Sequence, residues 1–206
     1  MKKEILQKTL DNLRKNGFDA RLVHNKEEAC TLIAEYIVPY GSVGFGGSMT
    51  ARELGLPDLA RAHKASVYDH WKPNLTQEEK MEVMRKCLTS DLYIASANAI
   101  SANGKIFNID GNGNRVAALT FGPKKVVIVA GMNKITPDEA SAMERIKTVA
   151  CPKNAARLNA KTPCVKLGYC ADCQAPERIC KITSVMEKKP GLTDITVIII
   201  DEELGY

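Results

Sequence analysis

The sequence predicts a single α/β domain over residues 1–206, built on a mostly parallel sheet with helices on both faces and carrying a cysteine-rich C-terminal loop at residues 164–180. Apolar segments of strand length alternate with helical segments, an order typical of parallel sheets. Candidate strands such as 126–130 are apolar throughout, as expected for a sheet buried on both faces. No linker rich in glycine, proline or serine divides the chain, so one domain is expected.

The first half of the chain begins with a helix at residues 4–15, where Leu6, Leu10 and Leu13 recur at helical spacing. Gly17 is placed to end this helix. The same alternation of patterns continues after it. It predicts a strand at 20–23, a helix at 26–38, a strand at 42–45, a helix at 50–54 and a strand at 66–68.

The second half repeats this alternation around one long polar segment, residues 96–115. The periodicity predicts a helix at 77–88, a strand at 92–95, helices around 116–119 and at 138–149, and strands at 126–130 and 195–200. The last strand is expected to complete the sheet after the cysteine-rich segment has looped out.

The composition is that of a folded globular protein, with 45% hydrophobic and 26% charged residues. The longest apolar runs are far shorter than the roughly 18 residues that a membrane span requires, so no span is expected. Residues 1–6 are basic but lack the apolar core of a secretion signal, which favours the cytoplasm. The net charge of +5 is scattered without a basic stripe, which argues against nucleic-acid binding and favours a small anionic ligand.

A glycine-rich turn at residues 43–50 is the first candidate site. Glycines allow backbone N–H groups to converge, and the following helix contributes its positive N-terminal end, so the turn suits a phosphate or carboxylate. It matches neither the P-loop nor the dinucleotide fingerprint. The alternative is a plain turn with Ser48 as the helix cap. The predicted anion-binding residues are Gly46, Gly47, Ser48 and Thr50.

The polar segment 96–115 is the second candidate site, because it follows a strand at the edge where open α/β sheets bind ligands. Its predicted ligand-orienting residues are Asn98, Asn103, Asp110 and Arg115. The alternative is a series of turns, with Asn112 or Asn114 as a helix cap and Arg115 paired with Asp110.

These residues resemble a known family. The run Gly44–Thr50, the segment Glu53–Gly55, the Asn103–Gly104 turn and Gly122–Lys125 before an apolar strand resemble the LUD-domain family, named for bacterial lactate utilisation. The likeness covers roughly residues 1–160. It implies the fold of the phosphosugar-isomerase and coenzyme-A-transferase-like superfamily, and a setting in lactate oxidation with iron–sulfur partner proteins.

A more distant likeness concerns residues 91–111. This stretch is similar to the pattern of methylthioribose-phosphate isomerases and their initiation-factor relatives, in which an aspartate transfers the proton. Asn98 stands at the place of that aspartate. Because an amide does not exchange a proton near neutral pH, the resemblance implies the fold and not that reaction.

Four of the seven cysteines lie close together near the C-terminus, with five, two and six residues between them. Four thiolates can hold an iron–sulfur cluster or, alternatively, zinc. A redox pair of Cys170 and Cys173 stays open, as does a core position for Cys180. Cys30 and Cys87 are expected in the core, and Cys151 could belong to either group. The predicted metal ligands are Cys164, Cys170, Cys173 and Cys180.

Together these features predict a LUD-type protein of lactate or related 2-hydroxy-acid utilisation, which binds a small anion and acts with iron–sulfur redox partners. Two alternatives stay open. One is an enzyme acting on a phosphosugar or coenzyme-A substrate, and the other is a regulatory module stabilised by zinc. The sequence leaves open whether the chain turns over a substrate and whether it forms homo-oligomers.

Overall fold

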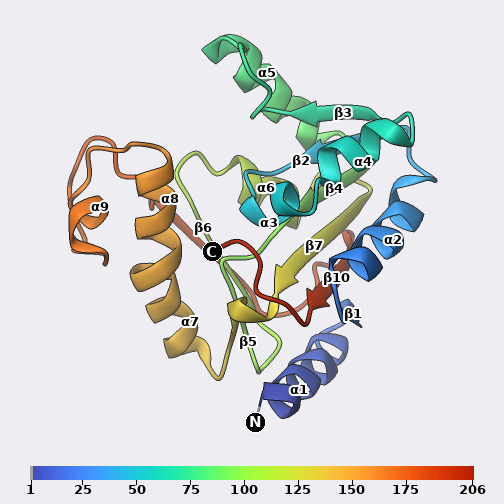
Figure 1. Cartoon of the computed structure of the whole chain (residues 1–206), viewed down its shortest axis with the longest axis horizontal. Coiled ribbons are helices and arrows are strands. Elements are labelled where there is room, and N and C mark those ends of the chain that lie inside the picture. The colour runs from blue at the N-terminus through green and yellow to red at the C-terminus, as the bar shows by residue number, and fades with distance from the viewer. Residues whose placement is uncertain (1) are drawn as a thin grey trace.

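The fold is described from a computed structural model, which covers residues 2–206 and the side chains of residues 3–206. Met1, with which the predicted domain begins, lies outside the described residues. The described chain forms two sheets with helices packed on their faces, and three apolar clusters lie between these layers (Figure 1).

The larger sheet has six strands in the order β1-β10-β7-β4-β2-β3, and every neighbouring pair is parallel. The sequence predicts each of these strands. β10 is the last strand in the chain and pairs between β1 and β7, so it completes the sheet as predicted. The strands are β1 (Asp19–Val23), β2 (Ser42–Phe45), β3 (Ser66–Asp69), β4 (Leu92–Ala95), β7 (Lys125–Gly131) and β10 (Asp194–Ile200).

Both faces of this sheet are covered, because its strands are apolar on both sides. In β7, Val126 and Ile128 enter one apolar cluster, whereas Val127 and Val129 enter the other. The first cluster is covered by α1 (Lys2–Lys15), α5 (Gln77–Leu88) and α6 (Asn114–Thr120). The second is covered by α2 (Lys26–Ile37), α3 (Met49–Glu53) and α4 (Leu56–Ala62).

The smaller sheet corrects the interpretation of residues 96–115 as a series of turns. It has the order β8-β5-β6-β9, and β5 and β6 form a hairpin within that segment. Gly104 in the hairpin turn has φ +74°, and a Cβ there would lie 2.5 Å from the carbonyl carbon of Asn12 in α1. The strands are β5 (Ala99–Ser101), β6 (Ile106–Asp110), β8 (Ile135–Thr136) and β9 (Ile182–Met186).

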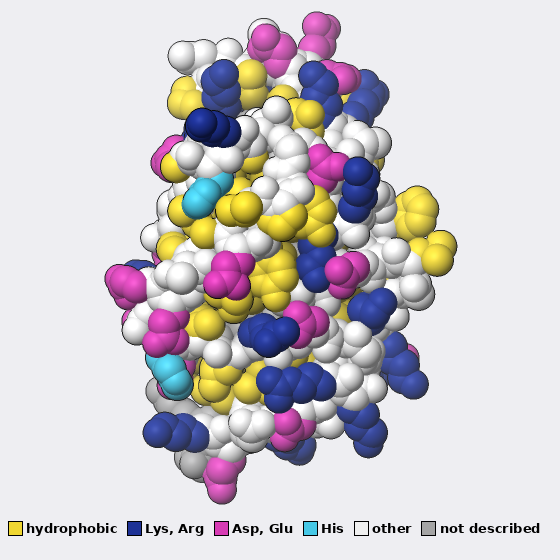
Figure 2. Space-filling model, turned by 90° about the vertical axis from the view of Figure 1, so that its right-hand side faces the viewer, with side chains coloured by type: hydrophobic (Ala, Val, Ile, Leu, Met, Phe, Trp, Pro, Cys, Tyr) yellow, Lys and Arg dark blue, Asp and Glu magenta, His cyan; other side chains and the backbone are white. Residues whose placement is uncertain are grey.

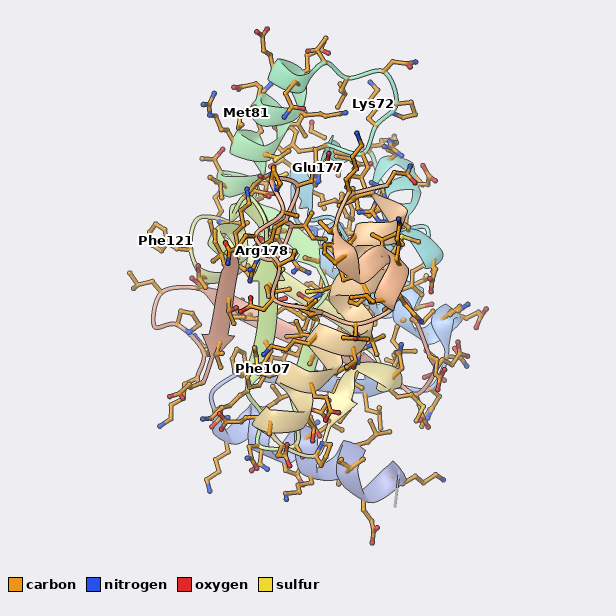
Figure 3. The ribbon with its side chains drawn as sticks, turned by 90° about the vertical axis from the view of Figure 1, so that its left-hand side faces the viewer. Lys72, Met81, Phe107, Phe121, Glu177 and Arg178 are labelled. Carbon is orange, nitrogen blue, oxygen red and sulfur yellow. The ribbon has the colours of Figure 1, made fainter. Side chains whose placement is uncertain are left out.

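A helical column covers the smaller sheet and stands apart from the larger one in Figure 1. It consists of α7 (Glu139–Arg145), a π-helical turn (Ile146–Ala150) and α8 (Cys151–Arg157). Phe107 of β6 packs with Ala142 and Ile146 of the column, and Figure 3 shows Phe107 behind α7. The short α9 (Pro163–Leu167) and the cysteine-rich loop follow at the outer edge. The predicted helix at 138–149 is therefore part of a longer column.

Charges of both signs are mixed on the surface. Figure 2 shows the side on which α2 lies, where basic and acidic side chains alternate without forming a basic stripe. Across residues 2–206, none of the helices combines the length and the apolar character needed to cross a membrane.

Candidate anion-binding crevice

A crevice of about 390 Å³ opens at the carboxyl ends of the central parallel strands. One wall is formed by residues 47–49 after β2, residues 96–98 after β4, and Lys134 after β7. The opposite wall comes from α8 and the cysteine-rich loop, where Figure 3 labels Arg178. This edge of a parallel sheet is where open α/β folds bind ligands.

The lining of the crevice is strongly cationic. Among the described residues that line it, Asp110 is the only carboxylate, and its charge is matched by Arg115 at 2.8 Å. An excess of positive charge in a recessed site attracts anions. The cationic lining residues are Lys80, Arg115, Arg157, Arg178 and Lys181, and the buried amine of Lys134 lies among them.

Three of the predicted ligand residues form one hydrogen-bond network. Arg115 donates from Nε to Asp110 Oδ1 at 2.9 Å and from Nη2 to Asn98 Oδ1 at 2.6 Å. Asp110 Oδ2 accepts a hydrogen bond from the Val116 N–H at 2.9 Å, so it caps the first turn of α6. The cap is therefore Asp110 and neither of the predicted asparagines, and Arg115 makes the ion pair that the sequence left as an alternative. This network fixes the amide of Asn98 in the crevice wall.

Lys134 is the functional candidate that sequence reasoning missed. It lies in a short 3₁₀ helix (Met132–Lys134) after β7, is only 2% exposed, and lines the crevice. Its Nζ donates to Thr50 Oγ1 and to Ser96 Oγ, both at 2.8 Å. Burial, together with the charges of Arg145 and Arg115, lowers the pKa of Lys134 to about 7. Its position directly after a predicted strand is the one signal that could have indicated it.

An aromatic and cationic cluster forms the mouth of the crevice. The guanidinium of Arg157 lies 4.2 Å from the centre of the Trp71 ring, and that of Arg52 lies 5.0 Å from it. His70 also lines the crevice. Its buried Nδ1 has no hydrogen-bond partner within residues 2–206, and burial lowers the pKa of its imidazole.

The glycine turn contributes to the wall of the crevice through close packing. A Cβ at Gly46 would lie 2.7 Å from the Tyr93 hydroxyl, and one at Gly47 would lie 3.1 Å from the Trp71 ring. Ser48 accepts a hydrogen bond from the Ala51 N–H at 3.1 Å and caps α3, as the plain-turn alternative predicts. Gly47 and Ser48 nevertheless line the crevice, and Thr50 reaches it through Lys134.

Asn103 lies away from the other predicted ligand residues. It occupies the exposed turn between β5 and β6, beside α1, where its carbonyl accepts a hydrogen bond from Asn16 Nδ2 at 3.0 Å. It is not among the described residues that line the crevice. Its place next to Gly104 makes it a hairpin residue.

The four predicted metal ligands border one small cavity. Cys164 lies on α9, Cys170 and Cys173 in the coil that follows, and Cys180 just before β9; all four are half-buried and free. Cys151 borders the same cavity as Cys180. Burial raises the pKa of Cys151 to about 12.

This cavity adjoins the crevice, since Cys151, Arg178 and Ile179 border both. Among the residues that the structure describes, no group of three or more His, Cys, Asp or Glu side chains is arranged to hold one metal ion. Metal binding therefore stays a prediction. Of the other two cysteines, Cys87 is a buried member of an apolar cluster, as predicted, whereas Cys30 is half-buried and packs against the second cluster from outside.

The fold and the crevice define an α/β protein with a ligand site at the carboxyl edge of a parallel sheet. The model of the LUD domain matches residues 6–200, and the chain belongs to this family, which is associated with lactate utilisation. No curated protein matches the sequence.

Two solved structures are similar to this chain to different extents. A DUF162 family protein from Deinococcus radiodurans is 16% identical, with a TM-score of 0.55, over 97% of this chain and 98% of that chain. The structure of eIF2B beta from Chaetomium thermophilum is 19% identical, with a TM-score of 0.30, over 60% of this chain and 39% of that chain. The first confirms the fold across almost the whole chain.

Proposed function

We propose that the crevice binds a small carboxylate, either a 2-hydroxy acid such as lactate or the corresponding 2-oxo acid, and that the protein acts with iron–sulfur oxidoreductase partners in lactate utilisation. The single observation that carries this proposal is the crevice lining, in which five cationic side chains and the buried amine of Lys134 accompany one carboxylate. Family membership supplies the class of acid.

The neutral groups of the crevice support a hydroxy or oxo acid. Ser96, Asn98 and Asn154 line it and supply hydroxyl and amide groups beside the cations. A carboxylate would be held by charge-assisted hydrogen bonds, and the hydroxyl or carbonyl oxygen of the acid would meet the amide groups of Asn98 and Asn154. The volume exceeds that of a three-carbon acid, which leaves space for a second reactant.

Replacing Arg157 by methionine is expected to weaken the binding of pyruvate and lactate about tenfold or more, because a hydrogen bond to a charged group contributes about 1.5–3 kcal/mol. Arg157 is the test position because its Nη1 is free to bind the acid. Its Nε and Nη2 donate hydrogen bonds to Asn154 and Tyr206, and no described residue accepts a hydrogen bond from Nη1. The measurement is the ligand-dependent rise in melting temperature over a concentration series.

The matched control is Arg85→Met, which removes the same charge from the exposed surface of α5. It is expected to bind like the wild type. Equal protection of Arg157→Met and the wild type would contradict the proposal. Protection by glucose 6-phosphate at lower concentration than by pyruvate and lactate would favour the phosphosugar alternative instead.

We further propose that the four clustered cysteines hold an iron–sulfur cluster, with zinc as the alternative. The observation that favours it is that all four thiols border one cavity whose other polar side chains are Thr162 and Arg178. Thiolate ligands select zinc and iron–sulfur centres. Loading would require the thiols to turn toward one another.

Cys173→Ser is expected to lose the metal that the wild type retains after anaerobic purification, because a four-ligand site cannot close with three thiolates. Iron, acid-labile sulfide and zinc are counted in both proteins. Cys30→Ser, which changes a cysteine outside the cavity, is the control and should keep the metal. A metal-free wild type, or equal metal in Cys173→Ser, would refute the site; iron with sulfide identifies a cluster, and zinc alone identifies the alternative.

A further inference from the structure

Lys134 has the surroundings of a neutral amine. Its two hydrogen-bond partners among the described residues are hydroxyls, Thr50 Oγ1 and Ser96 Oγ. These hydroxyls donate their own protons elsewhere, Thr50 to the carbonyl of Leu204 and Ser96 to that of Ala97. Both are therefore acceptors toward the lysine. A neutral amine has two N–H groups and one lone pair. The two hydroxyl oxygens accept the hydrogen bonds from the two N–H groups, and the lone pair stays free.

No ion pair holds a charged Lys134. None of the ion pairs among residues 3–206 includes it. The charges of Arg145 and Arg115 oppose its protonation, and Glu53 is the one acid that favours it. A buried lysine next to other cations is the usual form of a nucleophilic amine in proteins.

The amine also borders the proposed ligand site. Lys134 lines the crevice together with Arg157 and Asn98, so a carboxylate held by the cations would place its neighbouring carbon within the same recess. In a 2-oxo acid that neighbouring carbon is an electrophilic carbonyl. In a 2-hydroxy acid it is not, and the amine would act only as a hydrogen-bonding group.

We propose that Lys134 forms an imine with the carbonyl carbon of a 2-oxo acid bound in the crevice, an inference that rests on the proposed carboxylate site. The lone pair of Nζ attacks the C2 carbonyl carbon, and one of the two amine protons passes to the carbonyl oxygen, which gives a carbinolamine. The C–O bond then breaks, the oxygen takes up the second amine proton and leaves as water, and a C=N bond joins Lys134 to the acid. No electron is gained or lost, and no co-reactant is needed.

Chemical trapping tests this inference on the full chain. The protein is incubated with pyruvate and sodium cyanoborohydride, which reduces an imine to a stable secondary amine, and the modified lysine is located by peptide mass mapping. We expect one carboxyethyl group per chain, with Lys134 labelled roughly tenfold more than any other lysine because its amine is desolvated. Lys134→Arg, which keeps a cation without a nucleophilic amine, should lose the label, and Lys153→Arg on the exposed surface of α8 should keep it.

The site of labelling in the wild type decides the question even if Lys134→Arg fails to fold. Labelling spread over surface lysines, or none at all, would overturn the imine. The melting temperature with pyruvate is measured in parallel. If pyruvate protects the wild type but leaves no label on Lys134, the carboxylate site stands and the imine fails; if pyruvate gives neither protection nor label, both proposals fail.

Discussion

Wild-type protein is expected to gain stability relative to Lys134→Met as the pH rises from about 7 toward 10.5. The lower limit is the pKa of Lys134 in the folded protein, and the upper limit is the ordinary pKa of a lysine. In this interval the unfolded chain binds the proton at Lys134 and the folded chain does not, so alkaline conditions favour folding. Below about pH 7 both states hold the proton and the difference should be flat. The slope is at most about 1.4 kcal/mol per pH unit.

This prediction is measured as the difference in free energy of unfolding between the two proteins, from urea titrations across this pH interval with the cysteines kept reduced. Groups that titrate in both proteins cancel in the difference. Lys153→Met, which removes an exposed lysine from α8, should leave the wild-type pH dependence unchanged. A wild-type curve parallel to that of Lys134→Met would show that Lys134 is protonated in the fold and would contradict its role as a neutral amine.

Replacing Asp110 by asparagine is expected to destabilise the protein by about 3 kcal/mol or more, because it leaves a buried guanidinium without its counter-charge. The side chains of Asp110 and Arg115 are only 8% and 11% exposed, and they lie 2.8 Å apart. Asparagine can still accept the hydrogen bond from the Val116 N–H, so the substitution keeps the helix cap and removes the charge.

Urea unfolding measures this loss of stability, and two further variants serve as comparisons. Asp58→Asn breaks an exposed ion pair on α4 and should cost no more than about 1 kcal/mol. Adding Arg115→Met to Asp110→Asn should recover part of the loss, since the unpaired cation is then gone. A loss in Asp110→Asn no larger than that in Asp58→Asn would contradict the description of Arg115 as a buried, paired cation.

The larger sheet could be predicted from the sequence because its signals are local. The strand 126–130 and the last strand are apolar throughout, and helical spacing of leucines marks the first helix. The smaller sheet could not be predicted in this way. Asn108 and Asp110 of β6 are polar but buried, so the alternation that identifies a strand is absent, and pairing with β9 joins residues more than seventy positions apart.

The candidate site was predictable in its location and only partly in its members. The dense polar segment pointed to Asn98, Asp110 and Arg115, and the structure brings these three together. Asn103 looked similar in sequence, but the hairpin carries it away from the crevice. Lys134 carries no local sign of its role, because its burial results from contacts with Thr50 and Ser96, which are distant in the chain.

Calorimetric titration of the wild-type protein with pyruvate shows directly whether the crevice binds a small carboxylate. We expect saturable binding at one site per chain, competed by lactate and weakened in Arg157→Met. No saturable heat at millimolar pyruvate, or binding of equal strength in Arg157→Met, would contradict it.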